Sequence, residues 1–162
     1  MRLHQRLSTL LVIAALPVAA LGLAACTGIA DATKEDTSPA KVEAIDGSKQ
    51  KRITLRPEAA KRIGLKTEPI LDAAGSPAAS QAFGAAFAAG KTTMPYGALI
   101  YHADGTTYAY TATQPLTFTR VPVTVASIKT GIVALSAGPA VGTEIVTVGT
   151  AELHGLETGV GK

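Results

Sequence analysis

The sequence predicts a mainly β domain, a small antiparallel β-barrel or β-sandwich with one or two short helices, preceded by a disordered tether. Three observations predict it. Five or six short apolar stretches recur about every 8–12 residues between residues 52 and 162. Turn dipeptides such as Asp104-Gly105 and Thr130-Gly131 separate some of them. Residues before 52 lack this pattern, so residues 52–162 are expected to form one domain.

The chain begins with a segment typical of export. Arg2 and Arg6 precede an apolar stretch at residues 7–23, and small residues follow it. Leu-Ala-Ala-Cys at residues 23–26 resembles the lipobox of bacterial lipoproteins. The resemblance implies a signal peptide over residues 1–25, cleavage between Ala25 and Cys26, and a diacylglyceryl thioether on Cys26.

Two other interpretations of this segment remain open. One is a plain secretory signal followed by an unrelated cysteine. The other is an uncleaved membrane helix, which needs about 20 apolar residues, whereas this stretch is shorter and contains Pro17. Cys26 is the only cysteine, so it has no disulfide partner within the chain. We expect an exported protein held by lipid on the extracytoplasmic side of a bacterial membrane, with the choice of membrane open.

Residues 26–51 are polar and without sustained periodicity, which predicts a flexible tether. The full chain has 15 Lys and Arg against 12 Asp and Glu, and loss of Arg2 and Arg6 with the signal leaves 13 against 12. The mature chain is therefore nearly neutral. Its charge predicts no nucleic-acid partner.

The predicted domain begins with a short apolar strand at Ile53–Leu55. A two-turn helix is expected over Pro57–Ile63, because Pro57 suits the first helical turn and Gly64 suits the stop. Leu65–Leu71 then has the character of an extended segment.

Residues 72–93 are rich in Gly, Ala and Ser and predict a low-complexity connector within the domain. The alternative is a weak helix, because Phe83 and Phe87 are spaced by four residues.

Most of the predicted strands lie in the C-terminal part. Two apolar stretches around Asp104-Gly105 predict a hairpin. Residues 116–125 alternate and place Val121, Val123 and Val125 on one face. A strand is expected at Glu144–Val148, followed by a short helical turn near the C-terminus.

Catalytic constellations are not apparent in the sequence, which predicts neither an enzyme nor a bound cofactor. The weak metal-ligand candidates are Met94, His102 and His154, residue types that suit a soft ion such as copper(I). Met94 also fits an apolar core position, and the two histidines are isolated in sequence, with His102 expected at the surface.

The order of segments resembles the periplasmic adaptor, or membrane-fusion, subunits of resistance–nodulation–division efflux systems. Residues 53–71 look like the adaptor segment after the tether, and residues 94–160 look like the membrane-proximal domain. The adaptor's barrel and lipoyl domains and α-helical hairpin have no counterpart in the roughly twenty residues between. The resemblance implies a non-catalytic accessory protein that contacts an efflux transporter. Two alternatives remain open: a lipid-anchored carrier of copper, silver or a small ligand, and a remnant without a transport partner.

Overall fold

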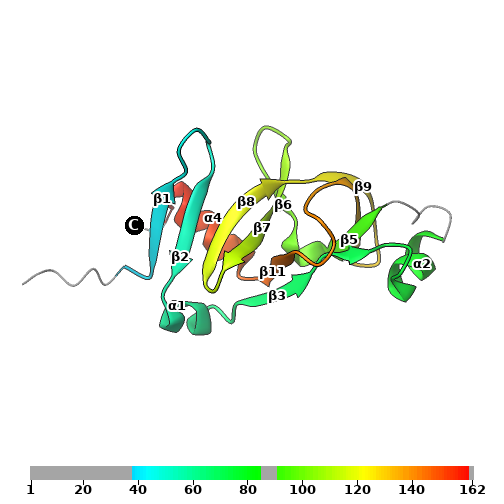
Figure 1. The fold of residues 1–162 in the computed structure, drawn as a ribbon, viewed down its shortest axis with the longest axis horizontal. Helices are drawn as coiled ribbons and strands as arrows, with labels where there is room; N and C mark the ends of the chain where they lie inside the picture. Colours follow the sequence, from blue (N-terminus) through cyan, green and yellow to red (C-terminus); the bar gives the residue numbers. More distant parts are fainter. Residues whose placement is uncertain (1–37, 85–90, 161–162) are drawn as a thin grey trace, which may run out of the picture. The chain divides into compact units, whose positions relative to one another are not determined.

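The computed structural model describes residues 38–84 and 91–160, which fall within one compact unit, Thr37–Lys162. The unit is mainly β with antiparallel sheets and short helices, as the sequence predicts (Figure 1). The predicted signal peptide, the cleavage site at Ala25 and the lipidation site at Cys26 lie outside the described residues. No helix in the described part has the length and hydropathy needed to cross a membrane.

The larger sheet has seven strands in the order β1–β2–β8–β7–β11–β3, with β6 paired to β7. Its neighbouring strands all run antiparallel. They are β1 (Ala40–Ala44), β2 (Lys51–Leu55), β3 (Lys66–Pro69), β6 (Ile100–Tyr101), β7 (Thr107–Gln114), β8 (Thr117–Pro122) and β11 (Glu144–Val148). The expected strand at Glu144–Val148 is confirmed.

The smaller sheet has four strands in the order β4–β5–β10–β9. They are β4 (Leu71–Asp72), β5 (Thr92–Pro95), β9 (Thr124–Lys129) and β10 (Ile132–Ala137). The described strands thus form two open sheets, and the barrel form of the prediction is not adopted.

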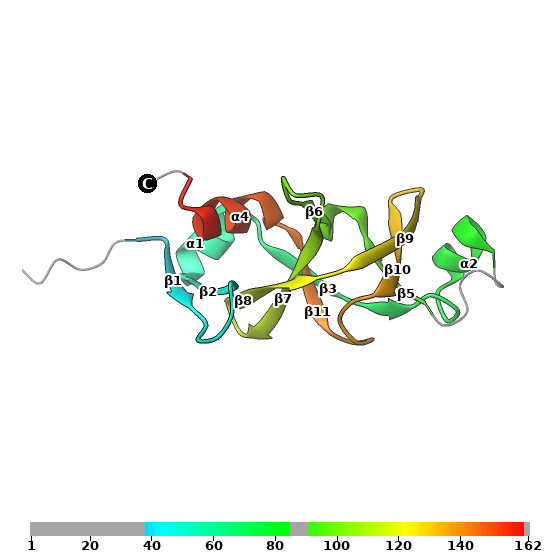
Figure 2. The same ribbon diagram turned by 90° about the horizontal axis from the view of Figure 1, so that it is seen from above.

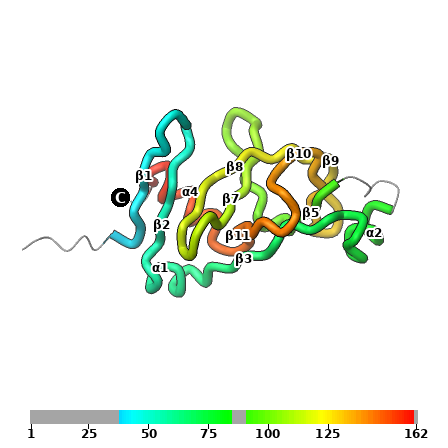
Figure 3. Tube along the Cα trace, viewed as in Figure 1, coloured from blue at the N-terminus to red at the C-terminus, as the bar shows by residue number. Residues whose placement is uncertain are grey.

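The alternating stretch at residues 116–125 is interrupted once, and its two parts belong to different sheets. The chain passes from β8 directly into β9 (Figure 3). Pro122 ends β8 and lacks an N–H group, and the N–H of Val123 donates to the carbonyl of Thr107 at 2.9 Å. Val123 and Val125 then contact the core of the smaller sheet, whereas Val121 pairs with Ala109 in the larger one.

Local signals explain the helices. Helix α1 (Pro57–Arg62) begins at its proline and is followed by Gly64 with a φ of 64°, which confirms the predicted element. Helix α4 (Thr150–Thr158) closes the chain, and the 3-10 turn η1 (Tyr96–Ala98) follows β5. Helices α1 and α4 lie on the same face of the larger sheet (Figure 2).

Two apolar cores hold these elements together. The first lies between the larger sheet and helices α1 and α4, and its buried members are Ala40, Ile53, Leu55, Ala60, Tyr110, Phe118, Val146 and Leu153. The second includes Ile70, Met94, Ala98, Ala109, Val123, Val133, Leu135 and Ile145. Both cores draw residues from β7 and β11, so these strands connect the two cores.

The tether prediction for residues 26–51 is wrong over its last part. Strand β1 lies within it and pairs with β2 from Ala40↔Leu55 to Ala44↔Lys51. Ala40 is buried in the first core, while Lys41 is exposed. This short strand carries charged residues and has no clear strand pattern in its sequence. Its order comes from pairing with β2. Residues 26–37 lie outside the described part.

The connector prediction for residues 72–93 is also wrong where the structure describes it. Helix α2 (Pro77–Phe83) occupies seven of these residues, and Ser76 caps it by accepting from the Ala79 N–H at 3.3 Å. Ala73 and Ala79 are fully buried, with Phe83 packed against them. The packing in this segment is formed mainly by small alanines. A composition rich in Gly, Ala and Ser does not by itself predict such packing. Phe87 lies outside the described residues.

Candidate functional site

The two histidines of the described residues, His102 and His154, lie side by side. His102 is in the turn between β6 and β7, and His154 is on α4. Their ring centroids are 6.4 Å apart with the planes nearly perpendicular. His102 is half-buried, with 38% of its side-chain surface exposed, because α4 and Tyr108 pack beside it.

Met94 is not part of this pair. It lies on β5 with 2% of its surface exposed, in the core with Ile70 and Val133. It therefore fills the core, the alternative that the sequence left open. In the described part of the chain, no three His, Cys, Asp or Glu side chains gather as a metal site would require.

A buried polar network lies beside the histidines. Glu157 on α4 is 4% exposed, and its Oε2 accepts a hydrogen bond from the Tyr110 hydroxyl at 2.5 Å. Its Oε1 lies 3.2 Å from Nε of Arg120, at ion-pair distance but without hydrogen-bond alignment. The Arg120 guanidinium in turn lies over the Tyr108 ring, 4.4 Å from its centroid.

Secondary structure places each member of this network. Tyr108 and Tyr110 are two residues apart on β7 and therefore share a face. Tyr110 is paired with Arg120 on β8. His154 and Glu157 are three residues apart on α4, so they lie on adjacent turns of one helix face.

Electrostatics favour the neutral phenol in this network. Burial, and secondly the Glu157 carboxylate that accepts its hydrogen bond, raise the pKa of Tyr110 above its ordinary value. The carboxylate has two partners within the fold, Tyr110 and Arg120. Lys51 also donates to the main-chain carbonyl of Glu157 at 2.7 Å. The network therefore holds α4 against β7, β8 and β2.

His102 also faces Asp104. Its Nδ1 is buried and lies 3.2 Å from Oδ1 of Asp104, but without hydrogen-bond alignment. Hydrogen bonds from the side chain and backbone of Thr106 lower the pKa of Asp104, and His102 adds a smaller effect in the same direction. Nδ1 of His154 is buried and has no hydrogen-bond partner in the described part.

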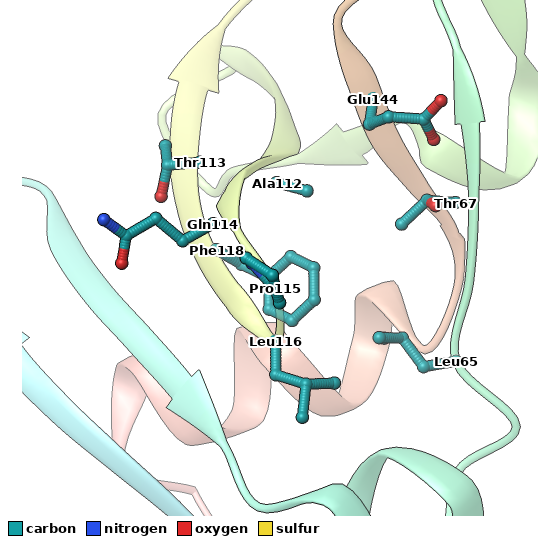
Figure 4. Close-up of a pocket in the computed structure, with 9 residues that line it drawn as sticks. All are labelled: Leu65, Thr67, Ala112, Thr113, Gln114, Pro115, Leu116, Phe118 and Glu144. Carbon is teal, nitrogen blue, oxygen red and sulfur yellow. The ribbon is translucent and has the colours of Figure 1, made fainter.

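An apolar groove opens elsewhere on the larger sheet, where β7 and β11 diverge beyond their single pairing at Thr111 and Ile145. Its volume is about 380 Å³. Figure 4 shows the side chains that line it: Leu65, Thr67, Ala112, Thr113, Gln114, Pro115, Leu116, Phe118 and Glu144. An open, largely apolar hollow with polar groups at its edge suits a protein or peptide contact.

Sequence reasoning missed the network residues Tyr108, Tyr110, Arg120 and Glu157. Two features of the sequence bear on these residues. Tyr108 and Tyr110 are two residues apart, as on one face of a strand, and His154 and Glu157 are three residues apart, as on one face of a helix. Neither indicates that β8 would bring Arg120 to Glu157 and over the Tyr108 ring.

Comparisons of the chain with family models, curated proteins and solved structures found no match.

Proposed function

We propose that this protein is a lipid-anchored, non-catalytic accessory protein that contacts a transporter at the membrane surface. One observation carries the proposal. The two stretches that resemble an efflux adaptor, residues 53–71 and 94–160, pair directly with each other in one unit. Ile53 on β2 is opposite Phe118 on β8, and Glu68 on β3 is opposite Ile145 on β11.

The groove beside β3 is the surface we assign to the transporter. Among the described strands, β3 is at the end of the strand order and pairs only with β11, and its four residues are exposed. A partner strand can add to such an edge while an apolar side chain enters the groove near Leu65 and Phe118. Both contacts are made by binding alone, without a chemical step.

Site-specific photo-crosslinking in intact cells tests this assignment. A photoreactive amino acid at Thr67 or Gln114, both at the groove, is expected to capture an extracytoplasmic transporter domain. The same group at Ser136, exposed on β10 in the smaller sheet, is the matched control. Equal capture from both places, or capture of no membrane transporter from either, would contradict the proposal.

The anchor requires its own experiment. Metabolic labelling with a radioactive fatty acid is expected to mark the wild-type protein and to fail for Cys26→Ser. The variant should be released from membranes or remain as an uncleaved precursor. Label retained on the variant would show that Cys26 is not the lipidated residue.

A second candidate function is a soft-metal carrier, favoured by the 6.4 Å approach of His102 and His154. Titration with copper(I) under reducing conditions decides it. This function requires stoichiometric binding that is lost in His102→Ala and His154→Ala but retained in Met94→Leu, because Met94 is in the core. Loss only in the methionine variant would exclude the histidine pair as the site.

A further inference from the structure

Charge is unevenly distributed along the described chain. Residues 49–66 contain seven basic residues and one acidic residue, Glu58. The rest of residues 38–84 and 91–160 contains four basic and eight acidic residues. The near-neutral total conceals this separation. The seven basic side chains all belong to exposed residues: Lys49, Lys51, Arg52, Arg56, Lys61, Arg62 and Lys66.

Four of these residues, Arg56, Lys61, Arg62 and Lys66, flank or belong to α1, and we call them the α1 basic surface. None of the four takes part in an ion pair with another described residue. Their charges are therefore not neutralised by side chains of the described fold.

The α1 basic surface includes an apolar hollow of about 430 Å³. Lys61 and Lys66 line it together with Pro57, Ala60, Gly64, Leu65 and Leu116. Leu116 has a φ of 57°, a left-handed conformation that is uncommon for a leucine, and this turn brings its side chain to the hollow. Exposed lysines around an apolar surface form the combination that binds the interface of an anionic bilayer.

The place where the described chain begins also indicates that the α1 basic surface faces a bilayer. The N–H of Arg56 donates to the carbonyl of Pro39 at 3.0 Å, so the α1 basic surface adjoins the first described residues. Pro39 is thirteen residues from Cys26. Even a fully extended chain of that length spans only about 45 Å. A lipid on Cys26 would therefore hold this surface near the bilayer.

We infer that the α1 basic surface binds the anionic surface of the membrane and orients the domain upon it. The inference rests on the lipid anchor of the proposed function for the proximity of the bilayer, but on the basic and apolar side chains for the binding itself. Phosphate groups pair with the four cations, and Leu65 and Leu116 contact the apolar part of the interface. The groove assigned to the transporter shares Leu65 and Leu116 and lies next to this surface.

Vesicle sedimentation with the chain from residue 26 onward, carrying Cys26→Ser, tests the binding without the lipid. This chain contains the whole compact unit. Vesicles of phosphatidylglycerol and phosphatidylcholine are compared with phosphatidylcholine alone. Lys61→Gln with Lys66→Gln should lower the partition coefficient about thirtyfold, since each basic residue near an anionic surface contributes about 1 kcal/mol. Lys91→Gln with Lys129→Gln makes the same change in net charge elsewhere and should leave it within about threefold.

The salt dependence gives a second measurement, because binding through these lysines should weaken steeply as ionic strength rises. Circular dichroism of both double variants checks that they are folded. Equal binding to the two kinds of vesicle, or equal losses in the two variants, would overturn the inference. So would absence of binding to lipid vesicles with retained binding to a transporter, a result that leaves the proposed function intact.

Discussion

Replacing Arg120 by Met tests whether the buried network holds helix α4 in place. The substitution keeps an unbranched apolar stem but removes the cation that lies 3.2 Å from Glu157. It leaves a carboxylate that is 4% exposed with Tyr110 as its remaining side-chain partner. It also removes the cation from the Tyr108 ring.

The magnitude follows from burial. Breaking a buried ion pair by removing one partner costs about 3–5 kcal/mol. The side chain of Arg120 is 13% exposed, so some solvent screening remains and the lower end of that range applies. The stacking on Tyr108 adds about 0.5–1 kcal/mol. We therefore expect Arg120→Met to lower the free energy of unfolding by about 3–4 kcal/mol.

Urea denaturation followed by circular dichroism measures this loss. With a slope of about 2 kcal/mol per molar, the midpoint should fall by roughly 1.5–2 M. The double variant Arg120→Met with Glu157→Gln should recover about 2 kcal/mol or more, since the neutral amide removes the unpaired charge and still accepts from Tyr110. Arg52→Met, at an exposed position on β2, is the control and should change stability by less than about 0.5 kcal/mol.

Two results would refute this reasoning. A cost below about 1 kcal/mol for Arg120→Met would show that the ion pair is not buried in solution. A double variant as unstable as the single one would show that the loss comes from packing and not from the unpaired carboxylate.

Three further changes test other parts of the fold. Thr130 and Gly131 both have positive φ in the β9–β10 turn, where a β-branched residue is strained. Thr130→Asn should therefore raise the unfolding free energy by about 1 kcal/mol. A loss of stability would contradict this turn geometry. Because the pKa of Tyr110 is raised in the folded protein, its contribution to the free energy of unfolding is complete below the ordinary tyrosine pKa of about 10. That contribution falls as the pH rises above this value. Tyr110→Phe should flatten this alkaline decline in a pH series of urea midpoints, and an unchanged decline would remove Tyr110 as its source. Ser76→Ala removes the cap of α2 and should cost about 1 kcal/mol locally, visible as faster amide hydrogen exchange in Pro77–Phe83 but not in β8.

Elements with local signals could be predicted from the sequence. Proline and glycine bound α1, because the first restricts φ and the second tolerates the positive φ found at Gly64. The turns at Asp104-Gly105 and Thr130-Gly131 are local in the same sense, and the pairing of their strands confirms them. These preferences act over a few residues, so the sequence alone carries them.

Only the tertiary structure decided the features that depend on distant residues. The sequence of β1 has no strong strand pattern. β1 is ordered by its pairing with β2, and nearly all of β2 lies outside residues 26–51. His102 and His154 approach each other because α4 packs on the larger sheet, and the same packing brings Arg120 to Glu157. The α1 basic surface likewise gains its apolar hollow from Leu116, a residue fifty positions beyond Lys66 in the chain. Backbone propensity is a short-range property, whereas these contacts are selected by burial of apolar surface across the whole chain.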